Sequence, residues 1–361
     1  MQGVRPTATA ACPSYPTIVP FACILLMAIV IVHAAPAWSP QTSGVTATLR
    51  GVSAASDRVA WASGSGSTIL RTADGGITWT KLAPPSADRL DFRDIDAIDE
   101  RTAYLLSIGS GTLSRIFKTT DAGAHWETLY TNQDPKAFFD AMAFSDGDHG
   151  IVIGDSVDGR FSILLTEDGG KTWTPPPAAG LPTALTNEGA FAASGTNVAF
   201  FGRDDIWFGT GAAEKARVLH SHDRGRTWTV AETPIVAGRS AGIFSVAFRD
   251  SEHGVVVGGD YTKEKEAIDN IAVTSDGGKT WTLVKDHPLS GFRSAVAYAP
   301  RARTPSLIAV GPQGADWSTD DGRTWTPIAG PGFHSFSFSK TGTVGWGAGG
   351  RGNIAKLVHL K

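Results

Sequence analysis

The chain has 361 residues, of which 42% are hydrophobic and 19% charged, a balance typical of a folded globular protein and not of a disordered one. Its formal net charge is −3 at pH 7 and its basic residues form no long run, so the charge pattern gives no sign of nucleic-acid binding. The 42 glycines stand mostly beside Asp, Asn or Ser, which favours many tight turns between short strands.

The N-terminal segment has the pattern of a secretory signal. Arg5 precedes an apolar run, Phe21–Val32, and the small-x-small motif Ala35-Pro36-Ala37 follows. These three features together are typical of a signal peptide. We therefore expect residues 1–37 to be removed and residues 38–361 to form an exported domain, periplasmic or extracellular. An uncleaved membrane anchor is the alternative, although the apolar run is shorter than the ~20 residues that span a bilayer.

Both cysteines, Cys12 and Cys23, fall inside this segment. The mature chain would then have no thiol for a disulfide, for catalysis or for a metal site. We expect no cofactor and no bound metal. His220 and His222 have the strand spacing of two ligands on one face, but the sequence shows no third ligand beside them. Asp204 and Asp205 lack the spacing of a calcium loop.

One motif occurs six times along the chain, as in Thr72-Ala73-Asp74-Gly75-Gly76-Ile77-Thr78-Trp79. The copies cover residues 72–79, 119–126, 166–173, 221–228, 274–281 and 318–325. Their Asp positions, 74, 121, 168, 223, 276 and 320, are 47, 47, 55, 53 and 44 residues apart. Repeats of ~40–50 residues with strand patterning indicate the four-stranded blades of a β-propeller.

The motif has a structural logic. The Asp can accept backbone N–H groups, the Gly supplies a positive φ, and the Trp buries its ring beneath the turn. A residue that recurs in every blade is structural rather than catalytic, so we assign the set no catalytic role. The set is Asp74, Trp79, Asp121, Trp126, Asp168, Trp173, Asp223, Trp228, Asp276, Trp281, Asp320 and Trp325. The second copy differs, with His125 where the others have Thr.

The motif resembles the Asp box, also called the bacterial neuraminidase repeat. A longer template precedes two copies, Phe144-Ser145-Asp146 with His149-Gly150, and Phe248-Arg249-Asp250 with His253-Gly254. From about residue 44 onward, this template resembles the photosystem II stability/assembly factor-like propellers. The resemblance implies a propeller that binds or assembles a protein client.

The strand count predicts seven blades. Three strands follow the sixth motif, at 333–338, 344–348 and 353–360, and no motif comes after them. The segment Trp38–Val45 can supply the missing outer strand and so remove the exposed edge of an open ring. The prediction is an all-β, seven-bladed propeller of four-stranded antiparallel blades. Six blades and a stray hairpin are the alternative.

Candidate binding residues come from the face opposite the motifs, where first strands start. Arg50, Arg93 and Arg293 can converge on an anionic group, with Glu188 and His334 at equivalent starts. The alternative is rim charge or pairing between blades. On the same face, Trp207, Phe208 and Tyr261 are predicted in long loops of blades four and five, where they either anchor a partner or form a local cluster.

Three functions remain open. The first is a non-enzymatic propeller that binds a protein client, with Arg50, Arg93 and Arg293 on the docking face. The second is a glycoside hydrolase acting on a glycan; the chain lacks the Arg-Ile-Pro motif of sialidases and is too short for the two tandem propellers of xyloglucanase-like enzymes. The third is a rigid platform for sorting or assembly. We expect a monomer, with membrane contact only through an uncleaved N-terminal segment.

Overall fold

The computed structural model describes residues 35–340, 342 and 344–358, together with Gly3 and Ala11. Residues 34–361 form one compact unit. The predicted signal peptide, with Cys12 and Cys23, lies almost wholly outside the described residues, and its cleavage after Ala37 stays a prediction. Within the described ranges, no helix has the length and apolar character needed to cross a bilayer.

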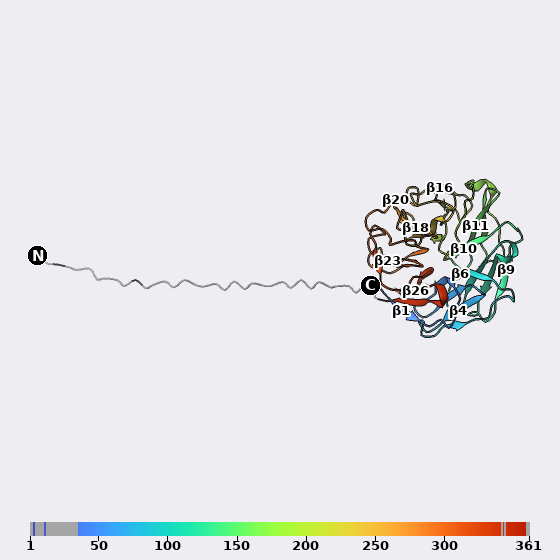
Figure 1. Cartoon of the computed structure of the whole chain (residues 1–361), viewed down its shortest axis with the longest axis horizontal. Coiled ribbons are helices and arrows are strands. Elements are labelled where there is room, and N and C mark those ends of the chain that lie inside the picture. The colour runs from blue at the N-terminus through green and yellow to red at the C-terminus, as the bar shows by residue number, and fades with distance from the viewer. Residues whose placement is uncertain (1–2, 4–10, 12–34, 341, 343, 359–361) are drawn as a thin grey trace. The chain divides into compact units, whose positions relative to one another are not determined.

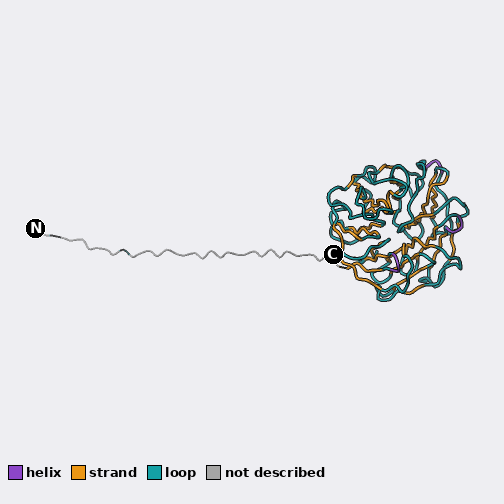
Figure 2. Tube along the Cα trace, in the orientation of Figure 1, coloured by secondary structure: helices purple, strands orange, loops and turns teal. Residues whose placement is uncertain are grey.

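Seven antiparallel sheets stand around a common centre, with β6 and β10 near the middle and β9, β16 and β20 at the rim (Figure 1). Figure 2 shows that strands and loops make up nearly all of this unit. Its described helical segments are three short 3-10 turns, η1 (Gly111–Leu113), η2 (Ala178–Gly180) and η3 (Gly350–Gly352). The predicted seven-bladed β-propeller is confirmed.

In each blade the strands are hydrogen-bonded in chain order, and the last blade ends on β1. Blades one to three are β2 (Leu49–Ala54), β3 (Ala60–Gly64), β4 (Thr68–Thr72), β5 (Thr80–Lys81); β6 (Asp91–Ala97), β7 (Ala103–Ile108), β8 (Arg115–Thr119), β9 (Glu127–Thr131); and β10 (Phe139–Phe144), β11 (Gly150–Val157), β12 (Arg160–Thr166). Blades four and five are β13 (Val198–Phe201), β14 (Asp205–Gly209), β15 (Arg217–Ser221), β16 (Thr229–Glu232); and β17 (Ala241–Phe248), β18 (Gly254–Asp260), β19 (Ile271–Thr274), β20 (Thr282–Leu283). Blades six and seven are β21 (Ala295–Tyr298), β22 (Leu307–Gly311), β23 (Gly314–Ser318), β24 (Thr326–Ile328); and β25 (Ser335–Phe338), β26 (Gly345–Ala348), β27 (Ile354–Val358), β1 (Ala37–Gln41).

Blade three departs from the predicted four strands. Its outer strand is reduced to one bridge between Leu165 and Thr174. Three prolines, at 175–177, follow that bridge. Proline has no N–H to donate to a strand ladder, so the outer strand ends where the prolines begin.

Strand β1 closes the ring, as predicted. It pairs antiparallel with β27 from Ala37↔Val358 to Gln41↔Ile354. The Trp38 ring lies 4.5 Å from that of Phe333. Gln41 Oε1 accepts the indole N–H of Trp79 at 2.9 Å and that of Trp346 at 3.2 Å, which ties blade seven to blade one.

The six motifs form one recurring turn, called here the repeated turn. In each, the hydroxyl of the Thr or Ser that opens the motif donates to the Asp Oδ1 at 2.7–3.0 Å. The same hydroxyl accepts the backbone N–H of the Gly four residues later at 2.8–3.0 Å. The Asp Oδ2 accepts from the Thr before the Trp. His125 takes the place of that Thr, with its Nδ1 2.7 Å from Asp121 Oδ2. These contacts support the structural role assigned to the Asp residues.

The core lies in the seams between blades, where apolar clusters join neighbouring sheets. Trp207 belongs to such a seam: its ring stacks 3.7 Å from Phe248 of blade five, and its Nε1 donates to Gly277 O at 2.9 Å. The predicted loop position of Trp207 and Phe208 is therefore wrong, and both are fully buried in β14. Gly202, with φ +62°, makes the tight turn that allows Asp205–Gly209 to pair as a strand.

Candidate functional site

The first strands of four blades each carry a β-bulge near their start. The register shifts between Leu49 and Gly51, Phe92 and Asp94, Phe139 and Ala141, and Ile243 and Ser245. The extra residues are Arg50, Arg93, Asp140 and Phe244. A bulge leaves its extra residue unpaired and re-aims the side chain. All four of these residues line one pocket, so the bulges build the site.

This pocket, called here the mouth pocket, has a volume of ≈ 430 Å³. Every blade contributes to its lining; Arg50, Arg93, Asp155, Ala212, Tyr261, Phe292 and His334 represent blades one to seven. The repeated turns are hydrogen-bonded to the hairpins between first and second strands, for example Gly75 N to Arg58 O at 2.9 Å. They therefore lie at the other ends of the first strands, on the opposite face, called here the turn face.

Two cations lie at the mouth pocket. Burial, and then the charge of Arg93, lower the pKa of Arg50 to about 10, so the Arg50 guanidinium keeps its charge at neutral pH. Arg50 Nε is buried and has no hydrogen-bond partner among the described residues. Arg93 is held by Asp91, with Nε to Oδ2 at 3.0 Å, and donates to Ala192 O at 2.8 Å. Two neighbouring cations, one of them incompletely paired, favour an anionic ligand.

His334 lies beside these arginines. Burial, and then the charges of Arg50 and Arg93, lower its pKa to about 4, so the ring is neutral at pH 7. Its Nδ1 is buried and unpartnered within the part of the chain that the structure describes. The ring can therefore offer a ligand one donor or one acceptor without adding charge.

Three carboxyl groups also line the pocket, those of Asp140, Asp155 and Glu264, and the first two lie close enough to affect each other's charge. Burial and the charge of Asp155 raise the pKa of Asp140 well above its ordinary value. Burial also raises the pKa of Asp155 to about 6. The pair therefore holds a proton more tightly than free carboxylates do. The sequence alone does not show that these two side chains come together, because they belong to different strands.

Raised carboxyl pKa values make stability fall as pH rises. The folded state keeps its proton on Asp155 up to about pH 6 whereas the unfolded chain releases it near 4, so the stabilisation is lost as pH rises through the folded value. We expect the Tm to fall between about pH 4 and 7, and Asp155→Asn to flatten that fall. Differential scanning fluorimetry against pH measures both slopes.

The exposed Asp158→Asn, three residues away, is the matched control and should leave the slope unchanged. The repeated turns act in the opposite direction but at lower pH, since hydrogen bonds from Thr78 lower the pKa of Asp74 to about 2. An unaltered slope in Asp155→Asn would contradict a proton shared at the mouth pocket.

Aromatic rings form the apolar wall of the mouth pocket. Phe191 stacks on Phe244 with centroids 3.9 Å apart, and Phe292 meets Phe244 edge-on at 4.7 Å. Tyr261 reaches over both Phe191 and Phe244 at about 6 Å and is 48% exposed. Tyr261 is thus where the sequence placed it, an aromatic ring available to a partner. The sequence analysis missed the three phenylalanines, because phenylalanines that line a pocket have the same sequence pattern as those of the hydrophobic core.

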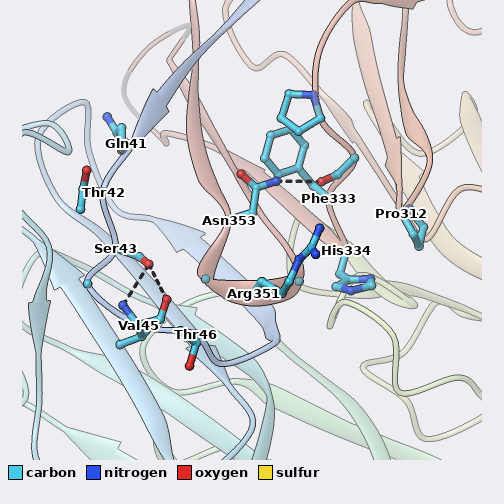
Figure 3. Close-up of a pocket in the computed structure, with 15 residues that line it drawn as sticks. Gln41, Thr42, Ser43, Val45, Thr46, Pro312, Phe333, His334, Arg351 and Asn353 are labelled. Atoms are coloured by element: carbon cyan, nitrogen blue, oxygen red, sulfur yellow. Dashed lines mark hydrogen bonds between the residues drawn. The ribbon is translucent and has the colours of Figure 1, made fainter.

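A second hollow of ≈ 820 Å³ adjoins the mouth pocket and shares Pro312 and His334 with it. The link between β1 and β2 forms one side, and the η3 loop forms another. Figure 3 shows Ser43 hydrogen-bonded to the backbone of Val45, and Arg351 and His334 at one end. The two hollows therefore meet at Pro312 and His334.

Two predicted site residues are not available to a ligand at this pocket. Arg293 is 1% exposed, and its Nε donates to Asp316 Oδ2 at 2.7 Å. Glu188 is also 1% exposed and binds Arg217, whose Nε lies 2.8 Å from Glu188 Oε1. Both are buried ion pairs; that of Arg293 lies within blade six, not between blades as the alternative expected. Trp207 is core, as described above.

His220 and His222 do have a third neighbour. Asp205 Oδ1 lies 3.2 Å from His220 Nε2 and 2.6 Å from His222 Nδ1. Asp205 opens β14, 15 residues before His220. The sequence did not group them because it did not show that β14 and β15 pair here.

Comparison with known proteins identifies the architecture. No family model matches the chain. YCF48 bound to D1 peptide superimposes with a TM-score of 0.61 and 19% identity, over 89% of this chain and 96% of that one. YCF48 from Cyanidioschyzon merolae gives 0.58 and 18%, over 89% and 98%. The chain shares its propeller fold with YCF48. The predicted resemblance to photosystem II assembly factors is thus confirmed for the fold.

Two further matches are partial. A GH74 xyloglucanase from Xanthomonas campestris superimposes with a TM-score of 0.62 and 16% identity, over 88% of this chain and 53% of the enzyme. The vacuolar protein sorting/targeting protein 10 of Colletotrichum graminicola is 30% identical over 102 residues. That stretch is 27% of this chain and only 6% of the fungal relative. At its low identity the GH74 match shows a shared propeller fold, and the sorting-protein match shows a local sequence similarity.

Proposed function

We propose that this protein is an exported, non-enzymatic binding propeller, and that its mouth pocket takes an extended segment of a protein client. The observation that carries the proposal is the set of four β-bulges in the first strands. Their extra residues, Arg50, Arg93, Asp140 and Phe244, all line the mouth pocket. Together with the stacked phenylalanines they offer a cationic end and an apolar wall. A segment with a carboxylate beside an apolar side chain fits both.

The shape of the site supports an extended ligand. The mouth pocket and the hollow in Figure 3 share His334 and Pro312, so a chain anchored at the arginines has a path over blade seven. YCF48 in a complex with the D1 peptide has the same fold, which makes peptide binding by this fold a precedent. Action outside the cytoplasm follows from the predicted signal peptide.

Peptide binding tests the proposal. We would screen the purified protein against fluorescent peptides that pair an acidic residue or a free carboxyl terminus with Leu or Phe, and measure Kd by polarisation. The Arg50→Ala/Arg93→Ala double variant should bind at least ~10-fold more weakly, because each lost charge-assisted hydrogen bond is worth about 1.5–3 kcal/mol.

The control is Arg224→Ala/Arg226→Ala, two exposed arginines of a repeated turn on the opposite face. Circular dichroism checks that both double variants fold. Equal binding by the wild-type protein and the Arg50/Arg93 variant, or no binding by any peptide class, would contradict a peptide site at the mouth pocket.

A glycoside hydrolase is the second candidate, and the Asp140–Asp155 pair is the observation that favours it. A carboxyl group with a raised pKa can act as a general acid beside a second carboxylate. The test is a panel of aryl glycosides and plant oligosaccharides. Turnover that Asp155→Asn abolishes would establish the enzyme; under the binding proposal no glycan is cleaved.

A further inference from the structure

The cluster of Asp205, His220 and His222 lies at the repeated turn of blade four, apart from the mouth pocket. Asp205 is the first residue of β14, His220 belongs to β15, and His222 is the second residue of the turn. One ligand atom from each lies within 4.8 Å of the other two. We propose that these three side chains bind a divalent transition-metal ion of the zinc class.

The donor set fits such an ion. Two imidazole nitrogens and one carboxylate oxygen are ligands that Zn²⁺ and its neighbours accept, with a further position left for water. Bonds of 2.0–2.2 Å in a tetrahedron separate two ligand atoms by about 3.3–3.6 Å. Asp205 Oδ1 and His220 Nε2 are already 3.2 Å apart. The 2.6 Å contact to His222 must open slightly, which an exposed side chain permits.

The cluster is held in place before any ion binds. The His220 ring stacks on Trp207 with centroids 4.3 Å apart, and Trp207 is itself fixed by its hydrogen bond to Gly277 O. The side chain of His220 is 5% exposed, whereas that of His222 is 63% exposed. The inner ligand is therefore rigid and the outer one is open to solvent, so an ion has a route of entry.

Asp205 differs from the other aspartates that contact histidine. Asp146 Oδ1 accepts the backbone N–H groups of Asp148 and His149, at 2.9 and 2.8 Å, so its His contact belongs to a turn. Asp250 Oδ1 accepts from Glu252 and His253 in the same way. Among the described residues, the Asp205 carboxylate has hydrogen bonds only to the two imidazoles, and both converge on the same oxygen. A cation at that convergence satisfies all three groups at once.

Metal titration tests the proposal. The protein is purified without a histidine tag, stripped with EDTA, exchanged into buffer and titrated with ZnCl₂ by calorimetry, with Tm followed in parallel. We expect one ion per chain and a Tm that rises with zinc, because an ion that binds only the folded state stabilises it. His222→Ala should weaken binding at least ~10-fold, since even an outer-shell partner is worth 10–100-fold in affinity.

His222 is exposed, so its removal should leave the fold intact; Asp205→Asn is the second variant, matched in shape. His253→Ala is the control, because it removes a contact between His253 and Asp250 that has no second histidine beside it in the described parts of the chain. If zinc does not bind, or binds the His222→Ala and wild-type proteins equally, the cluster is only a hydrogen-bonded contact and the proposal fails. Peptide affinity at the mouth pocket reports separately on the proposed function.

Discussion

Replacing Asp316 by Ala is expected to lower the free energy of unfolding by about 3–5 kcal/mol, because it leaves a buried guanidinium without its counter-charge. Asp316 is fully buried. It receives the Nε of Arg293 at 2.7 Å and the hydroxyl of Ser290 at 2.8 Å. Chemical denaturation followed by tryptophan fluorescence measures the loss.

Two controls separate this effect from the loss of any salt bridge. Asp88→Ala removes the exposed partner of Arg115 and should lower the free energy of unfolding far less than Asp316→Ala does. The double change Arg293→Met/Asp316→Leu removes both charges and should recover much of the loss. A small effect from Asp316→Ala would mean that water reaches Arg293, and Arg293 would again become a candidate for ligand binding.

Deleting residues 38–41 is expected to be the second large perturbation. It removes the four residue pairs from Trp38↔Leu357 to Gln41↔Ile354 and the Trp38 ring against Phe333. We expect the free energy of unfolding to fall by at least ~3 kcal/mol, the lower end of the cost of removing a large aromatic side chain from a core. The bared β27 edge should also promote association, since unpaired strand edges template pairing.

Denaturation and size-exclusion chromatography measure these two effects. Ser39→Ala on the exposed side of β1 is the control and should change neither. An unchanged free energy of unfolding after the deletion would mean that blade seven is stable with three strands. Blade three, which lacks a full outer strand, would then be the precedent. In that case the ring does not depend on its N-terminal strand.

The repeated turns made the fold predictable from the sequence. Each turn fixes the hairpin between the third and fourth strands through contacts within eight residues, so the local pattern is enough to mark a blade. The register in blade four was not predictable in this way. Apolar residues on both sides of Gly202 allow two positions for the first hairpin, and only the packing of Trp207 against Phe248 decides between them.

The site was predictable in part. Arg50, Arg93, His334 and Tyr261 meet at the mouth pocket as expected, since all come from strand starts or loops of one face. The bulges that aim Arg50 and Arg93 leave no mark in composition or spacing. Arg293 occupies the same kind of position but has Asp316 within reach, and this partner comes from the third strand of the same blade. Pairing between residues far apart in the sequence therefore decides which arginine is available to a ligand.

The closure by β1 also constrains the order in which the molecule can be made. Strand β1 leaves the ribosome before any blade, whereas its partner β27 is the last strand of the described chain. The six other blades can pair from neighbouring segments as they emerge, but blade seven cannot be completed until synthesis has passed residue 358. During all of that time β1 is an unpaired strand, and its pairing is the longest-range contact that folding must find, which makes it a late step. On the proposal that the protein is exported, a chain translocated before this step can close its ring only after it has arrived.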